Sequence, residues 1–206
     1  MIFAAQAGDG KERACYIRFF NGAAGAQTAD IFVNDQLIVQ DLAHGAFSPF
    51  RQAKSGAYRV EVRIDGGNTE LDYSELLSLM EDMSYTVAMT GDAAHLGLAV
   101  VPLDLRRDIR RPNVRFANVV PYDTVLDVDI NHRRAAEGLM YREVSNDIAI
   151  AADGHVVTVF DSYGRKVLED GLQIQANHNY LGMIAGSMED PENAPGLYVA
   201  EDMPLL

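Results

Sequence analysis

The stretch Arg18-Phe19-Phe20-Asn21, followed by Asp30-Ile31-Phe32-Val33-Asn34, decides the fold because the chain carries it twice. It returns 97 positions later as Arg115-Phe116-Ala117-Asn118 and Asp127-Val128-Asp129-Ile130-Asn131. Near the end of each copy, residues 85–91 match residues 180–186 at an offset of 95. The chain is therefore predicted to be a tandem of two similar modules, and a function of the module must rest on what both copies keep.

The repeat sets the domain boundaries. A chain of 206 residues would by length alone form one or two domains. The repeat favours two, each long enough to bury its own core without a metal or a disulfide. We predict an N-terminal arm at 1–13, a first repeat at 14–105, an Arg-rich linker at 106–112 and a second repeat at 113–206.

Short runs of alternating apolar and polar residues, separated by turn residues, predict β-strands throughout. Residues 16–20, 29–33 and 57–64 alternate in this way, and Asn34-Asp35 suits a tight hairpin turn because both residue types tolerate positive φ. This pattern is typical of an all-β chain of two antiparallel sandwiches. The chain has no Trp and one Cys, so a Cys…Trp…Cys core is excluded. The predicted core residues are Ile17, Phe19, Ile31, Val33, Val60, Val62 and Val87, with Val114, Phe116, Val128, Ile130, Val157 and Val159 in the second copy.

One segment is ambiguous, because the leucines between Glu70 and Met83 also fit an amphipathic helix. Its counterpart at 166–175 contains Gly171 and alternates from Leu172 to Ile174. We therefore predict strands in both copies, with a bulge at Gly171 and a short helical turn at 74–80 as the alternative.

An ordered set of motifs recurs in both copies. Copy one reads Arg18…Asn21, 29–35, Leu42-Ala43-His44-Gly45-Ala46-Phe47-Ser48, 56–62 and Tyr85-Thr86-Val87…Gly91, and copy two reads 115–123, 126–131 and Tyr180…Gly186. Each copy resembles the family of the bacterial domain of unknown function 4397. Asp35 and His132 stand where that family prefers Gly, and residues 139–150 are the part least similar to it. The resemblance implies an immunoglobulin-like β-sandwich, often in surface or secreted bacterial proteins, with no established activity and no catalytic residues.

The repeat also argues against a metal or catalytic site that only one of the two copies carries. None of the five histidines (His44, His95, His132, His155 and His178) recurs at the repeat offset or pairs at metal-ligand spacing. Asp127, Asp129 and Asn131 share one strand face that could suit Ca²⁺, but copy one has Phe32 in the middle, which favours a solvated face. We expect no cofactor, no metal and no catalytic residue.

Two charged pairs do recur, Arg18 with Asp30 and Arg115 with Asp127. Each pair stands on strands that follow one another in the chain, on the faces opposite the predicted core. We therefore predict structural cross-strand ion pairs that fix the register of the strands, each worth at most about 1 kcal/mol if exposed.

Composition limits the partners. The net charge of −13 disfavours nucleic acid and anionic lipid. No stretch reaches the length of a membrane span, and residues 1–7 lack the features of a signal peptide, which predicts synthesis in the cytoplasm and a spore or cell-surface location only by a non-classical route. Cys15 is read as a small apolar strand residue, with an intermolecular thiol as the alternative.

Two functions remain in competition. The first is a non-catalytic structural or interaction protein, such as a self-assembling bacterial surface or spore-associated component, whose apolar arm at 1–7 adds a strand to a neighbour's sheet. The second is a module that binds carbohydrate or another ligand, with Tyr122, Tyr141, Tyr163 and Tyr198 as contact candidates. An enzyme is disfavoured because no reactive constellation is present.

Overall fold

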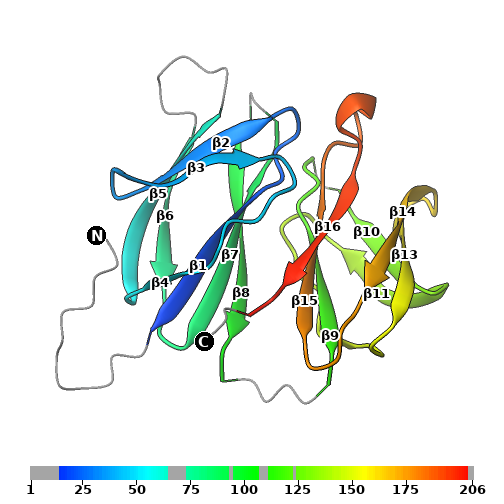
Figure 1. Cartoon of the computed structure of the whole chain (residues 1–206). Helices are drawn as coiled ribbons and strands as arrows, with labels where there is room; N and C mark the ends of the chain where they lie inside the picture. Colours follow the sequence, from blue (N-terminus) through cyan, green and yellow to red (C-terminus); the bar gives the residue numbers. More distant parts are fainter. Residues whose placement is uncertain (1–13, 65–72, 93–94, 107–110, 123, 204–206) are drawn as a thin grey trace. The chain divides into compact units, whose positions relative to one another are not determined.

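The structure is a computed structural model that describes residues 14–64, 73–92, 95–106, 111–122 and 124–203. The predicted arm at 1–13 and most of the linker lie outside these residues. The chain divides into two compact units between residues 107 and 108. The first unit runs from blue to green in Figure 1, and the second from green to red.

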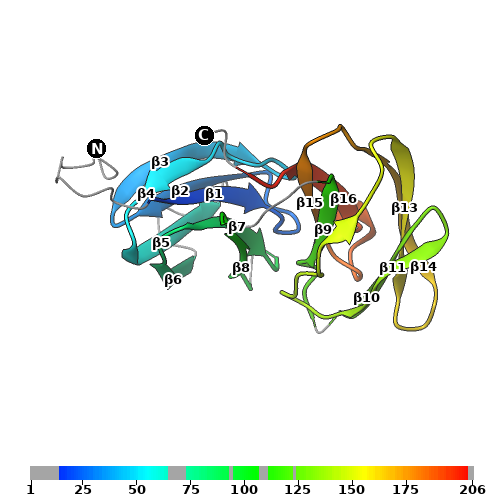
Figure 2. The same ribbon diagram turned by 90° about the horizontal axis from the view of Figure 1, so that it is seen from below.

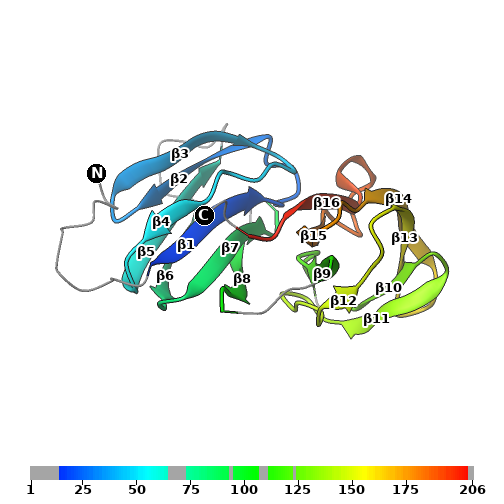
Figure 3. The same ribbon diagram turned by 60° about the horizontal axis from the view of Figure 1, so that its bottom comes forward.

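The first unit is a sandwich of two sheets, whose strands are labelled in Figure 3. One sheet has the order β4-β1-β7-β8 and the other the order β3-β2-β5-β6. The strands are β1 (Cys15–Asn21), β2 (Thr28–Val33), β3 (Gln36–Ala43), β4 (Arg51–Ala53), β5 (Gly56–Ile64), β6 (Tyr73–Leu79), β7 (Met83–Thr90) and β8 (Gly97–Asp104).

The second unit repeats this plan, with sheets in the orders β12-β9-β15-β16 and β11-β10-β13-β14. Figure 2 shows β9, β15 and β16 in one layer and β10, β11, β13 and β14 in the other. The elements are β9 (Asn113–Asn118), β10 (Leu126–Ile130), β11 (Arg133–Leu139), β12 (Ile148–Ala149), β13 (Gly154–Asp161), β14 (Lys166–Gln173), β15 (Asn179–Ala185), the 3₁₀ turn η1 (Pro191–Asn193) and β16 (Gly196–Glu201).

The predicted all-β, two-sandwich fold is confirmed, with one correction to strand direction. β1 pairs with β7 in parallel, and β9 pairs with β15 in parallel, while every other pairing between named strands is antiparallel in the described residues. Alternation in a sequence reveals which face a side chain occupies but not the direction of the neighbouring strand. The parallel pairing is open to these strands because the whole second sheet lies between them in the chain.

Each unit has its own apolar core. All predicted core residues are buried there except Ile130, which is half-buried because it ends β10 at the hairpin turn. Cys15 is fully buried in the first core, and burial raises the pKa of its thiol.

Local chemistry explains the turns and the ambiguous segments. Asn34 and Asp35 have φ of 48° and 64°, and Asn131 and His132 have φ of 49° and 62°, as a tight two-residue hairpin turn requires. β6 and β14 are strands, as predicted. The bulge in β14 lies at Val167, because Phe160 pairs with Lys166 and Val159 with Leu168. Its predicted position at Gly171 is wrong, since Gly171 pairs in register with Val156.

Candidate functional site

A buried asparagine at the end of β1 and of β9 holds the same three backbone groups in both units. Asn118 is fully buried, and its Nδ2 donates to the carbonyl oxygens of Thr124 (2.8 Å) and Leu139 (3.0 Å), while its Oδ1 accepts from the amide of Val120 (3.0 Å). Asn21 bonds in the same way to Ala26, Leu42 and Ala23. Both residues belong to the repeated Arg-Phe-x-Asn motif, yet sequence reasoning missed their role. Their recurrence at the repeat offset was the feature of the sequence that could have revealed this role.

The recurring aspartates satisfy the backbone of bulged edge strands. Asp30 accepts from the amide of Asp41 and Asp127 from the amide of Gly138, both at 2.8 Å. Asp41 and Gly138 have positive φ, at 51° and 65°, where β3 and β11 carry extra residues relative to their partners. The aspartates therefore shape β3 and β11.

The predicted cross-strand pairs Arg18–Asp30 and Arg115–Asp127 are wrong, because β1 and β2 belong to different sheets, as do β9 and β10. Arg18 instead donates from Nε to Thr86 Oγ1 at 2.9 Å, and its guanidinium stacks on the rings of Phe47 and Phe50. Arg115 forms a buried ion pair with Asp202, with 2.6 Å between Nη2 and Oδ2. The prediction failed because consecutive strands were assumed to be neighbours in one sheet.

Two hydroxyl groups in each unit complete the set of recurring polar contacts. Ser48 Oγ accepts from the amide of Phe19, and Ser145 Oγ from the amide of Phe116, both at 2.9 Å. The Tyr85 hydroxyl accepts from the amide of Met80, and the Tyr180 hydroxyl accepts in the same way from Gln175. A tyrosine near the start of a strand that bonds back to the preceding chain is a known feature of immunoglobulin-like sandwiches.

The face that could suit Ca²⁺ is occupied by a guanidinium. Arg134 pairs with both Asp127 and Asp129, at 2.7 Å from its Nε to Asp129 Oδ1. Burial raises the pKa of Asp127, but hydrogen bonds from the Gly138 amide and from Arg134 outweigh it and leave that pKa lowered. In the described residues, no group of three or more His, Cys, Asp or Glu side chains could hold a metal ion.

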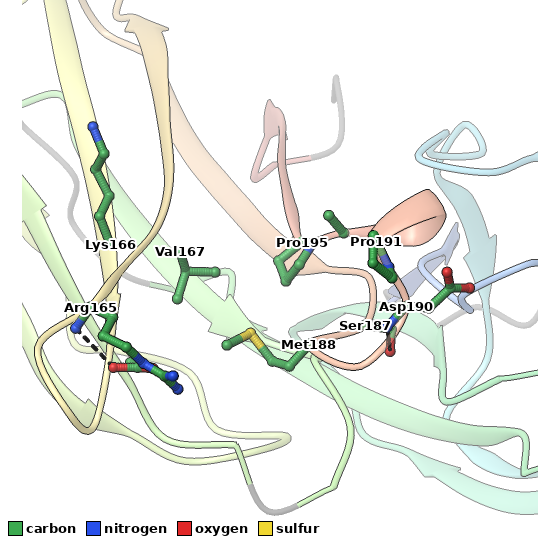
Figure 4. Close-up of a pocket in the computed structure, with 10 residues that line it drawn as sticks. Arg165, Lys166, Val167, Ser187, Met188, Asp190, Pro191 and Pro195 are labelled. Carbon is green, nitrogen blue, oxygen red and sulfur yellow. Dashed lines mark hydrogen bonds and ion pairs between the residues drawn. The ribbon is translucent and has the colours of Figure 1, made fainter.

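A pocket of about 360 Å³ opens in the second unit between the start of β14 and the segment that leads into β16. Figure 4 shows Met188 between Val167 on one side and Pro191 on the other. Asp161 and Arg165 form its charged border through an ion pair of 2.7 Å. The remaining lining residues are Lys166, Ser187, Asp190, Ala194 and Pro195.

Of the four candidate tyrosines, Tyr163 lies beside this pocket. It stands in the β13–β14 hairpin, its side chain is 83% exposed, and the Arg165 guanidinium lies 5.3 Å from its ring centroid. Tyr198 is half-buried on β16, and burial raises the pKa of its hydroxyl. Tyr122 is exposed after β9, and Tyr141 contacts Arg142 in the turn after β11. The candidates thus stand on separate segments of the unit.

A second pocket, of about 490 Å³, lies between the β10–β11 hairpin and residues 148–151. His155 lines it and is held by the Ala151 carbonyl oxygen and by Asn131, each at 2.9 Å. Arg133 and Arg134 add positive charge, while Ile148 and Ile150 add apolar surface. This pocket includes part of the segment 139–150, where the two copies differ most.

The fold and these contacts define a two-unit β-sandwich whose recurring polar side chains bond largely to the backbone. Residues 15–108 match the family model described as Domain of unknown function (DUF4397). The match covers a single copy, in the first unit. No curated protein matches the chain. Within the described part of the chain, no helix is long and apolar enough to cross a membrane.

Proposed function

We propose that this chain is a non-catalytic structural or interaction protein that associates with copies of itself. The observation that carries the proposal is that the recurring polar residues bond to the backbone of their own unit. Asn21, Asp30, Ser48 and Tyr85, and their counterparts in the second unit, each bond to the backbone of their own unit. What the two copies share is therefore a scaffold, because the shared polar residues supply bonds within each unit.

The second unit is proposed to be a second copy of the same module. It has the same two sheets with the same strand order, including the parallel pair. The four backbone contacts described above recur on residues at offsets of 97 or 95. Independent units would have no reason to place the same bonds at the same offsets.

The resemblance of the motifs to a family found in surface and secreted proteins supports a bacterial surface or spore-associated setting. The apolar residues 1–7 are a candidate strand donor, since a peptide that adds to an exposed sheet edge gains main-chain hydrogen bonds. This arm lies outside the described residues.

Sedimentation velocity across a concentration series tests self-association, with negative-stain images of the same samples. We expect the average mass to rise with concentration. A chain that sediments as a monomer at every concentration, and shows no assembled particles, would overturn the proposal.

A second candidate function is the binding of a carbohydrate or another small polar ligand in the second unit. It is favoured by the exposed Tyr163 ring next to a pocket bordered by Asp161, Arg165 and Lys166. Exposed aromatic rings stack on apolar ligand faces, while carboxylates and cationic groups bond to hydroxyls.

A glycan array probed with the whole chain tests this second candidate. Binding that Tyr163→Ala abolishes and Tyr122→Ala leaves intact would support it, because the Tyr163 ring contacts Arg165, which lines the pocket, whereas Tyr122 is exposed on another segment of the unit. An array that shows no binding, or an equal loss of binding in both variants, would count against a carbohydrate site at this position.

A further inference from the structure

Among the described strands, β6 forms one edge of its sheet. It ends its sheet, and in the described residues only β5 is hydrogen bonded to it (Figure 2). Its pairing with β5 runs from Tyr73 to Leu79 without a register shift, so the strand is regular. An edge strand directs alternate N–H and C=O groups away from its sheet, where they can pair with another strand.

β6 has no proline and no bulge, and its outer face carries no charge; Glu75 on the inner face is its one charged residue. Ser74, Leu76 and Ser78 are exposed and uncharged, and Met80 follows them. The Leu76 side chain is 69% exposed and that of Met80 is 60% exposed. Natural edge strands are protected by charged side chains, proline, bulges or short length.

Other edges of this chain do have such protection. β14, which occupies the place of β6 in the second unit, has a bulge at Val167 and carries Lys166, Glu169 and Asp170. β3 and β11 are bulged, β8 contains Pro102, and β4 and β12 span three and two residues. β16 ends at the charged Glu201 and is half-buried along the rest of its length.

The sequence of β6 is complementary to itself. In an antiparallel pair centred on Leu76, Leu76 faces its own copy and each Ser74 faces a Ser78, which are favourable cross-strand partners. Glu75, the one charged residue of the strand, then faces Leu77 of the other copy. A pair centred on Glu75 would place two carboxylates opposite each other, which is destabilising.

We propose that two copies of this chain dimerise by antiparallel pairing of β6 with β6, in the register centred on Leu76. This inference rests on the proposed self-association and names its surface. The interface is isologous, since the same strand contributes from both copies. It joins the two β3-β2-β5-β6 sheets into one continuous sheet.

The first test is Leu76→Lys, with Leu37→Lys as the matched control. Leu37 is an exposed apolar residue on β3, the opposite edge of the same sheet. We expect Leu76→Lys to weaken dimerisation at least about tenfold in sedimentation equilibrium, because two ammonium groups would face each other in place of two leucines. The control should dimerise like the wild type. Equal association in wild type and Leu76→Lys would overturn the β6 interface while leaving self-association in place.

The second test fixes the register and does not depend on a loss of binding. Directly opposite residues of an antiparallel pair are close enough for a disulfide. Leu76→Cys should therefore form a covalent dimer under mild oxidation, seen on a non-reducing gel. Ser74→Cys should not, since it faces Ser78, and the fully buried Cys15 leaves the wild type uncrosslinked. A Leu76→Cys protein that stays monomeric on the gel would overturn the register, as would preferential crosslinking of Ser74→Cys. A wild type that is monomeric at every concentration would overturn the dimer and the self-association together.

Discussion

Replacing Asn118 by alanine should destabilise the second unit more than an ordinary substitution of a polar residue. The side chain is fully buried and serves the carbonyl oxygens of Thr124 and Leu139 and the amide of Val120. Alanine fills part of the space but bonds to none of them. Each buried group that loses its partner costs about 1–3 kcal/mol. The contacts to Leu139 and Val120 are buried and the contact to Thr124 is partly buried, so the lower end of that range gives a loss of about 2–3 kcal/mol in the free energy of unfolding.

Urea unfolding followed by far-ultraviolet circular dichroism measures this loss. With a denaturant dependence of about 1–3 kcal/mol per molar urea, the midpoint of the affected transition should fall by about 1–3 M. Asn146→Ala is the control, because Asn146 is exposed and its only contribution to the contacts described is its backbone carbonyl. That change should stay within about 0.5 kcal/mol of the wild type. Coincident curves for the two variants would refute the assignment of Asn118 as a structural anchor.

Three further outcomes are expected in the second unit. Tyr180→Phe removes the hydroxyl that accepts from the Gln175 amide at 3.2 Å, so urea unfolding should show a loss of about 1 kcal/mol, and an unchanged midpoint would argue against the contact. Burial raises the pKa of Asp161, but hydrogen bonds from Arg165 and from the Tyr163 amide outweigh it and hold that pKa below 3.8. The ionised carboxylate therefore stabilises the fold above pH 3.8, and this stability is lost as the pH falls through the lower pKa of the folded state. When the free energy of unfolding is measured against pH in this acid range, Asp161→Asn should show a smaller change than the wild type. Asn131→Val places a β-branched residue at φ of 49° and should lower the melting temperature more than Asn131→Gly; equal melting temperatures would contradict the turn geometry.

The hairpin turns and the core could be predicted from the sequence because both depend on local properties. Asn34 and Asp35 tolerate positive φ whatever surrounds them, and alternation places Ile31 and Val33 on one face of their strand. The repeat added information that one copy alone lacks. The segment that contains β6 could be a helix by spacing, and its counterpart with Gly171 decided for a strand.

Strand pairing was not predictable in the same way. The pairing of Arg18 with Asp30 failed because a sandwich chain crosses from one sheet to the other between β1 and β2. Nothing in the alternation of either strand records that crossing. The role of Asn118 was hidden for a related reason, since its partner Leu139 lies 21 residues away and is brought close only by the fold.

The pockets could not be predicted from the sequence either. The pocket around Met188 is formed by residues 161–167 and 187–195, which belong to different hairpins and follow no periodic pattern. Tyr163 could be named as a candidate because an aromatic residue stands out in a turn. Its position beside a charged border depends on how Arg165 and Asp161 pair, which only the structure provides.

The two copies agree in their interiors and in the bulged edge strands β3 and β11, but they differ at β6 and β14, and this difference bears on how the chain assembles. Interior contacts such as those of Asn21 and Asn118 hold each unit together, so both copies must keep them. An edge strand is hydrogen bonded to only one neighbouring strand of its unit, so its sequence is freer to differ between the copies. With β6 regular and β14 bulged and charged, each chain offers one such edge at this position. A single self-complementary edge closes after two copies, so β6 pairing alone yields a dimer and never a filament. Larger assemblies of this protein would need a second contact, for which residues 1–7 are the candidate that the sequence supplies.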